Sequence, residues 1–162
     1  MGRQVENPGW HAFSIGGVTM KIISVLLLCL VCQLVLAGEK TYGSLQIDGI
    51  VSNYDGDTFT VNIPQWPAII GDKIEIRVAG IDTPEIHGHC ANEIAMAKKA
   101  KGIAATFLKT GRPVVLGNMR RDKYFRIVAD VSAEGVNLAD VLIKAGVAVP
   151  YDGGTKKPWC PL

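Results

Sequence analysis

Lys73-Ile74-Glu75-Ile76-Arg77-Val78-Ala79-Gly80-Ile81-Asp82-Thr83-Pro84-Glu85 is the stretch that decides the fold. Polar and apolar residues alternate over residues 73–78, which predicts a β-strand with one face on the core. The isoleucines and Val78 share the inward face, and Arg77 lies on the opposite face. We therefore expect Arg77 to be presented rather than buried.

The end of this stretch predicts a turn rich in oxygen atoms. Pro84 fixes its own backbone and keeps Thr83 out of the helical conformation, so the strand should stop here. The turn would gather the Asp82 carboxylate, the Thr83 carbonyl and Glu85, and such oxygen ligands suit a hard cation. Acidic turns are common, however, and this turn alone is equally compatible with ordinary solvated residues.

The chain has 162 residues and a formal net charge of +2, which suits one domain and gives no strong bulk attraction to polyanions. Residues 20–37 have the pattern of a secretory signal, with a short basic start, an apolar run and a small residue, Ala37, before the expected cut. We predict that residues 1–37 are an upstream extension and a signal that is removed, and that residues 38–162 form the domain. The predicted location is secreted or periplasmic, and an uncleaved membrane anchor is the alternative.

Patterning along the domain predicts an α+β fold. Strands are expected at 45–51, 58–63, 73–78, 113–116 and 127–131, with the first three forming a meander. A helix should begin near Asn92, and a shorter one should follow the N-cap Asn137 and end at Gly146. We expect a partly closed, five-stranded β-barrel of the oligonucleotide-binding (OB-fold) type with two to three packed helices. By strand parity, Asp57 should point inward, which is unusual for an acid.

Three separated pieces of sequence resemble the staphylococcal nuclease, or thermonuclease, family. They are Asp55-Gly56-Asp57-Thr58, the run from Arg77 to Glu85, and Asp122-Lys123-Tyr124-Phe125-Arg126. The conjunction is far more specific than any single piece, and the resemblance extends from about residue 50 to residue 146.

The resemblance implies an activity and a set of site residues. It implies a calcium ion held by oxygen atoms of Asp57, Asp82 and the main chain of Thr83. The residues implied for catalysis are Arg77 and Arg126, which contact the scissile phosphate, and Glu85, the general base. The residues implied for gripping a terminal phosphate are Lys123 and Tyr124. Relatives of this kind cut DNA and RNA with little sequence preference and leave 3′-phosphates.

Elementary chemistry is consistent with that assignment. Attack on a phosphodiester adds negative charge to an anionic centre, so arginines and a divalent ion stabilise the transition state. Departures from the family pattern lie at Phe125, where the family commonly has glycine, and in the lengths of segments 64–72 and 136–146. For this reason no base-stacking role is assigned to Tyr151.

Cys90 and Cys160 remain after the predicted signal is removed, and in an oxidising compartment we expect them to form a disulfide. This bond would order the C-terminal segment and let Trp159 pack on the domain. The sequence His87-Gly88-His89-Cys90 leaves a zinc site as the alternative, although no fourth ligand is recognisable.

Two other functions compete with a nuclease. The same barrel binds nucleic acid without cutting it when the catalytic residues are lost, so a non-catalytic OB-fold module is one alternative. A surface protein tethered by an uncleaved signal is the other. The leading expectation is a monomeric enzyme that acts on DNA and RNA and has no stable membrane association after signal cleavage.

Overall fold

The computed structural model describes residues 40–109 and 111–160. These described residues belong to one compact unit. In the described part of the chain, no helix combines the length and the apolar character needed to cross a membrane. The predicted upstream extension, signal and cleavage point after Ala37 lie outside the described residues.

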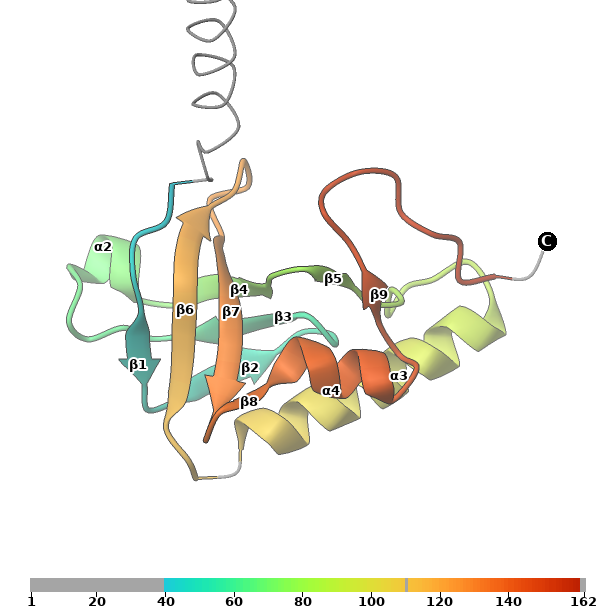
Figure 1. Cartoon of the computed structure of the whole chain (residues 1–162), viewed down its shortest axis with the longest axis horizontal. Coiled ribbons are helices and arrows are strands. Elements are labelled where there is room, and N and C mark those ends of the chain that lie inside the picture. Colours follow the sequence, from blue (N-terminus) through green and yellow to red (C-terminus); the bar gives the residue numbers. More distant parts are fainter. Residues whose placement is uncertain (1–39, 110, 161–162) are drawn as a thin grey trace, which may run out of the picture. The chain divides into compact units, whose positions relative to one another are not determined.

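Nine strands and three helices are described (Figure 1). The strands are β1 (Leu45–Ile47), β2 (Ile50–Asn53), β3 (Thr58–Val61), β4 (Ile74–Val78), β5 (Ile81–Asp82), β6 (Val114–Arg121), β7 (Ile127–Ala133), β8 (Val136–Asn137) and β9 (Val149–Pro150). The helices are α2 (Ala68–Gly71), α3 (Ala91–Leu108) and α4 (Leu138–Lys144).

The main sheet has the order β1-β6-β7-β4-β3-β2, with β8 paired to β7. The predicted meander is confirmed as β2-β3-β4, and the pairing of β4 with β7 is parallel. The prediction of one strand over 45–51 is wrong, because the chain breaks at Asp48-Gly49 into β1 and β2. These two pieces pair with β6 and β3, so one short stretch supplies both edges of the curled sheet. A straight strand cannot reach both partners.

The α+β, OB-fold-type architecture is confirmed, with more strands than predicted. The additional strands are short: β8 at the edge of β7, and β5 with β9 in a separate two-stranded sheet. The segment 64–72, expected as a loop, contains the single turn α2. β6 runs beyond its predicted end because the charged residues at 120–121 pair with the start of β7. Such side chains face outward while the backbone continues the ladder. β7 runs beyond its predicted end because Ser132 and Ala133 pair with the start of β6 and with β8.

The core lies between the curled sheet and the helices α3 and α4, which run side by side below the sheet in Figure 1. The buried face of α3 is rich in alanine, with Ala97, Ala100 and Ala104 at most 1% exposed, which permits close packing. Met96, on the same helix, is only half-buried. The N-cap prediction for α4 is confirmed, since Oδ1 of Asn137 accepts a hydrogen bond from N of Ala139 at 2.7 Å.

Candidate active site

A cleft of about 780 Å³ opens beside β3 and β4, facing the turn after β5 and the loop between β6 and β7. The side chains that line it come from segments far apart in the sequence. They are Tyr54, Asp55, Asp57, Thr58, Glu75, Arg77, Glu85, Asp122, Lys123, Tyr124, Arg126, Tyr151, Gly153 and Lys156. The structure therefore brings most of the predicted site residues to one cleft. Asp82 and Thr83 lie behind it and are almost fully buried.

Asp57 joins the turn before β3 to the turn after β5. Its Oδ2 accepts hydrogen bonds from N and Oγ1 of Thr83, both at 2.9 Å, and forms an ion pair with Nη1 of Arg77. Its Oδ1 accepts a hydrogen bond from Oγ1 of Thr58 at 3.1 Å. Asp57 as a residue is 4% exposed, which agrees with the inward direction predicted from strand parity. Two of the three residues predicted to hold the cation are thus in contact, through N and Oγ1 of Thr83 and not through its carbonyl.

The turn that carries Asp57 is shaped by Asp55 and Gly56. Oδ1 of Asp55 accepts hydrogen bonds from N of Asp57 at 3.0 Å and N of Thr58 at 2.7 Å. A Cβ at Gly56 would lie 2.6 Å from Cβ of Ala100 in α3, which is closer than real side chains approach. Burial and then the charge of Asp57 raise the pKa of Asp55 to about 6, although the backbone hydrogen bonds oppose this. Gly56 is therefore needed for packing against α3, and Asp55 for the hydrogen bonds that hold the turn.

Arg77 is more enclosed than predicted. Its side chain is only 12% exposed, because Asp57 and Asp82 surround the guanidinium, with Asp82 Oδ1 at 3.5 Å from Nη2. Nη2 also donates a hydrogen bond to the carbonyl of Ile81 at 3.0 Å. The alternation along β4 correctly predicted which face of the strand carries Arg77. Asp57 and Asp82, which cover this face, lie in segments outside β4. Arg77 is therefore partly buried, yet it still lines the cleft, as expected for a presented side chain.

Lys156 connects Asp82 to Glu85. Its Nζ lies 2.9 Å from Oδ1 of Asp82 and 2.7 Å from Oε1 of Glu85. Partial burial alone would lower the pKa of Lys156, but the hydrogen bond to Glu85 and the close contact with Asp82 raise this pKa well above its usual value. Asp82 is 1% exposed, so its carboxylate is in contact with these cationic neighbours and almost out of contact with water.

The loop between β6 and β7 is organised by Asp122. Its Oδ1 accepts hydrogen bonds from N of Tyr124 at 2.9 Å and N of Arg126 at 3.0 Å, and its Oδ2 accepts one from Nε of Arg126 at 2.8 Å. Partial burial tends to raise the pKa of Asp122, but these hydrogen bonds outweigh it and lower that pKa. The hydrogen bond from Nε of Arg126 to the Asp122 carboxylate therefore positions Arg126 at the cleft.

Phe125 does not displace Arg126 from the cleft. Its backbone has φ +68°, a conformation that favours glycine, which is the residue that the family commonly has here. The ring is 62% exposed and lies 4.1 Å from the guanidinium carbon of Arg121, whose Nη1 donates a hydrogen bond to the Phe125 carbonyl at 2.7 Å. The aromatic ring thus points out to Arg121, while Arg126 lines the cleft.

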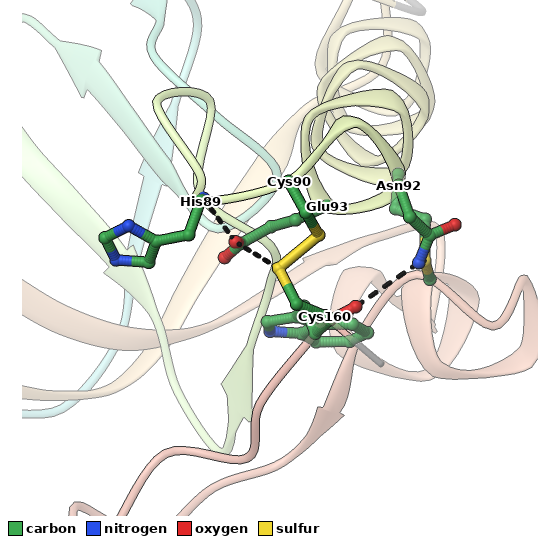
Figure 2. The surroundings of a disulfide bond; sticks show 7 residues. His89, Cys90, Asn92, Glu93 and Cys160 are labelled. Carbon is green, nitrogen blue, oxygen red and sulfur yellow. Dashed lines mark hydrogen bonds between the residues drawn. A yellow bond between two sulfur atoms is a disulfide. The ribbon is translucent and has the colours of Figure 1, made fainter. Parts of the chain in front are cut away.

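Cys90 and Cys160 form a disulfide, as the sequence predicts. Figure 2 shows the buried Glu93 beside it, where Oε2 accepts a hydrogen bond from N of His89 at 2.8 Å and touches Sγ of Cys160 at 3.5 Å. Asn92 donates a hydrogen bond to the main-chain carbonyl that precedes Cys160, at 3.2 Å. The zinc alternative loses its cysteine ligand while this bond is formed.

The comparison with known families agrees with this geometry. A family model described as staphylococcal nuclease homologue matches residues 75–158, more than half of the chain. The chain belongs to the staphylococcal nuclease homologue family. No curated protein matches it. The matched range of the family domain begins at Glu75, so it includes Arg77, Glu85 and Arg126 and leaves the turn at Asp57 outside.

The acidic residues around the cleft fit a hard divalent cation. Asp57, Asp82 and Glu85 offer carboxylate oxygens and no soft ligand, in keeping with calcium chemistry. Oδ1 of Asp82 is buried and has no aligned hydrogen bond among the described residues, although it touches two cationic groups. The donor set is therefore of the hard, oxygen-only kind that divalent cations such as calcium bind, and Arg77 and Lys156 balance part of its negative charge.

Sequence reasoning missed the roles of Asp55, Asp122 and Lys156. Asp55 and Asp122 each accept backbone hydrogen bonds from residues two to four positions later, a turn pattern typical of aspartate that the sequence offered. No local pattern marks Lys156, because it reaches the site only through β9 and the disulfide on either side of it.

Proposed function

We propose that this chain is a secreted, calcium-dependent nuclease that hydrolyses phosphodiester bonds of DNA and RNA with little sequence preference and leaves 3′-phosphates. The observation that carries the proposal is that Arg77, Glu85 and Arg126, from three separate segments, line one cleft. Family membership supports nuclease-like activity in general, and the disulfide supports an oxidising destination.

In this proposal each residue has one task. Asp57, Asp82 and the carbonyl of Thr83 would hold the calcium ion, which supplies positive charge that stabilises the developing phosphorane and polarises the phosphate oxygens. Glu85 takes the proton from the attacking water. Lys123 and Tyr124, both exposed at the rim, grip a terminal phosphate of the substrate.

The arginines stabilise the charge that builds up at phosphorus. A planar guanidinium group can bind two phosphate oxygens at once. Arg77 and Arg126 are each paired with an aspartate, Asp57 and Asp122. These pairs orient the side chains before substrate binds, and the phosphate then competes for the remaining N–H groups.

The second candidate is a non-catalytic nucleic-acid-binding module. It would need the barrel and the basic rim but neither Glu85 nor a cation site. The grouping of Glu85, Arg77 and Arg126 in one cleft favours catalysis, since binding alone requires no general base.

A nuclease assay on purified residues 38–162 tests the proposal, with single-stranded and double-stranded DNA and RNA as substrates. We expect cleavage with calcium, weak turnover with magnesium, and none in excess chelator. Glu85→Gln should keep nucleic-acid binding and lose most of kcat. Full activity in chelator would end the calcium claim, and binding without cleavage by the parent would favour the module. N-terminal sequencing of the exported protein tests cleavage after Ala37.

A further inference from the structure

We propose that the ammonium group of Lys156 acts as a built-in counter-ion of the cation site and competes with the divalent cation for Asp82 and Glu85. This inference rests on the proposed function, because it concerns the carboxylates assigned there to the cation and to the general base. It adds a residue that neither the sequence motifs nor the resemblance assigns.

The first observation is the position of the ammonium. Nζ of Lys156 lies between two carboxylates, 2.9 Å from Asp82 Oδ1 and 2.7 Å from Glu85 Oε1. The side chain of Asp82 is only 2% exposed, so water solvates its carboxylate very little. A cation that reaches the same oxygen must therefore move the ammonium aside or share the carboxylate with it.

The second observation is how the segment that carries Lys156 is attached to the domain. Residues 151–160, called the strap below, contain no helix or strand. Both ends of the strap are nevertheless attached to the rest of the domain. At one end β9 pairs with β5, and N of Tyr151 donates a hydrogen bond to the carbonyl of Gly80 at 2.9 Å. At the other end is the disulfide of Cys160. The strap thus holds Lys156 over the site at a high effective concentration.

The third observation is that the lysine is able to leave. Its side chain is 50% exposed, and the strap contains Gly153 at φ +98°, with Gly154 next to it. Moving the ammonium into solvent breaks two ion pairs, and water can hydrate the released lysine because its side chain is already half-exposed. A cation that binds the carboxylates can therefore displace the ammonium.

The test compares Lys156→Gln with Lys157→Gln in the purified, oxidised full chain. Lys157 is the matched control, because it is the adjacent exposed lysine and its removal changes the net charge equally. Calcium affinity is measured without substrate by isothermal titration calorimetry at fixed salt. We expect Lys156→Gln to tighten the calcium Kd about tenfold, which equals about 1.4 kcal/mol, and Lys157→Gln to change it less than twofold.

A second measurement follows the lysine itself. Amine labelling of the parent, read by mass spectrometry, should increase at Lys156 when calcium is added, while labelling at Lys157 stays constant as the internal control. Both results together support displacement of the ammonium by the cation.

The contrary outcomes separate the two proposals. If the parent and Lys156→Gln bind calcium equally, or if Lys156→Gln binds it more weakly, the competition is wrong and the calcium site stands. If neither the parent nor Lys156→Gln binds calcium, the cation site itself fails and the competition fails with it. Equal tightening by both glutamine variants would also overturn the inference, because net charge alone would then explain the effect.

Discussion

Gly56→Ala tests how the turn before β3, which carries the proposed cation ligand Asp57, is held against α3. A Cβ at residue 56 would lie 2.6 Å from Cβ of Ala100 and 2.9 Å from Cγ2 of Thr83. Neither neighbour can rotate out of the way, since a Cβ is fixed by its backbone and Thr83 is tied to Asp57 by two hydrogen bonds. The turn must therefore move away from the helix, Thr83 or both.

The expected cost follows from this clash. Overpacking a close-packed site by one methyl group costs about 1–3 kcal/mol, and we expect about 2 kcal/mol here because two contacts are violated at once. The shift also changes the separation of Asp57 from Thr83, so calcium affinity should fall about tenfold or more. Loss of affinity and loss of stability then have the same cause.

Gly102→Ala is the matched control. Gly102 lies on the exposed side of the same helix, and a Cβ there meets nothing within 4 Å. Alanine is the better helix former, so this change should stabilise the fold by up to about 1 kcal/mol and leave calcium affinity unchanged.

The assay is equilibrium denaturation in urea together with calorimetric titration of calcium, for the parent and both variants. Opposite signs of the change in unfolding free energy for the two glycines are the expected result. If Gly56→Ala unfolds at the parental midpoint and binds calcium as the parent does, the close packing of this turn on α3 and Thr83 is wrong.

Three further predictions concern the rim of the cleft and the strap. Arg126→Lys should lower kcat about 10²- to 10³-fold with little change in KM, because lysine keeps the charge and loses the planar fork; a near-parental kcat, with a collapse in the Arg121→Lys control, would move the second phosphate contact to Arg121. Reduction of the disulfide opens a loop with a sequence separation of 70 residues, so unfolding free energy should fall by up to about 4 kcal/mol. Thermal melts with and without reductant measure this loss, and unchanged midpoints with two labelled thiols would refute it. Phe125→Gly should not destabilise the fold, since relief of about 1 kcal/mol of backbone strain at φ +68° offsets the lost stacking on Arg121; a drop of more than about 1 kcal/mol in urea unfolding would contradict that.

Local periodicity was sufficient for most elements of the fold. The alternation around Ile76, the helix that begins near Asn92 and the cap at Asn137 each reflect contacts within a few residues, and each is present in the structure. The strand at 45–51 failed because its break at Asp48-Gly49 is imposed by pairing with β6 on one side and β3 on the other. Pairing partners of that kind are distant in sequence and leave no local pattern.

The candidate site divides in the same way. The resemblance of three sequence motifs to the staphylococcal nuclease family indicated Asp57, Arg77, Glu85 and Arg126, and phosphate chemistry is consistent with such carboxylates and guanidinium groups. The sequence by itself thus determined the family, the fold class and the chemical groups. Only the tertiary structure decided that Arg77 is enclosed and that Lys156 bridges Asp82 and Glu85. Those contacts depend on how separate turns and the disulfide-bound strap meet in space, and the charge a residue feels is set by neighbours that the local sequence does not contain.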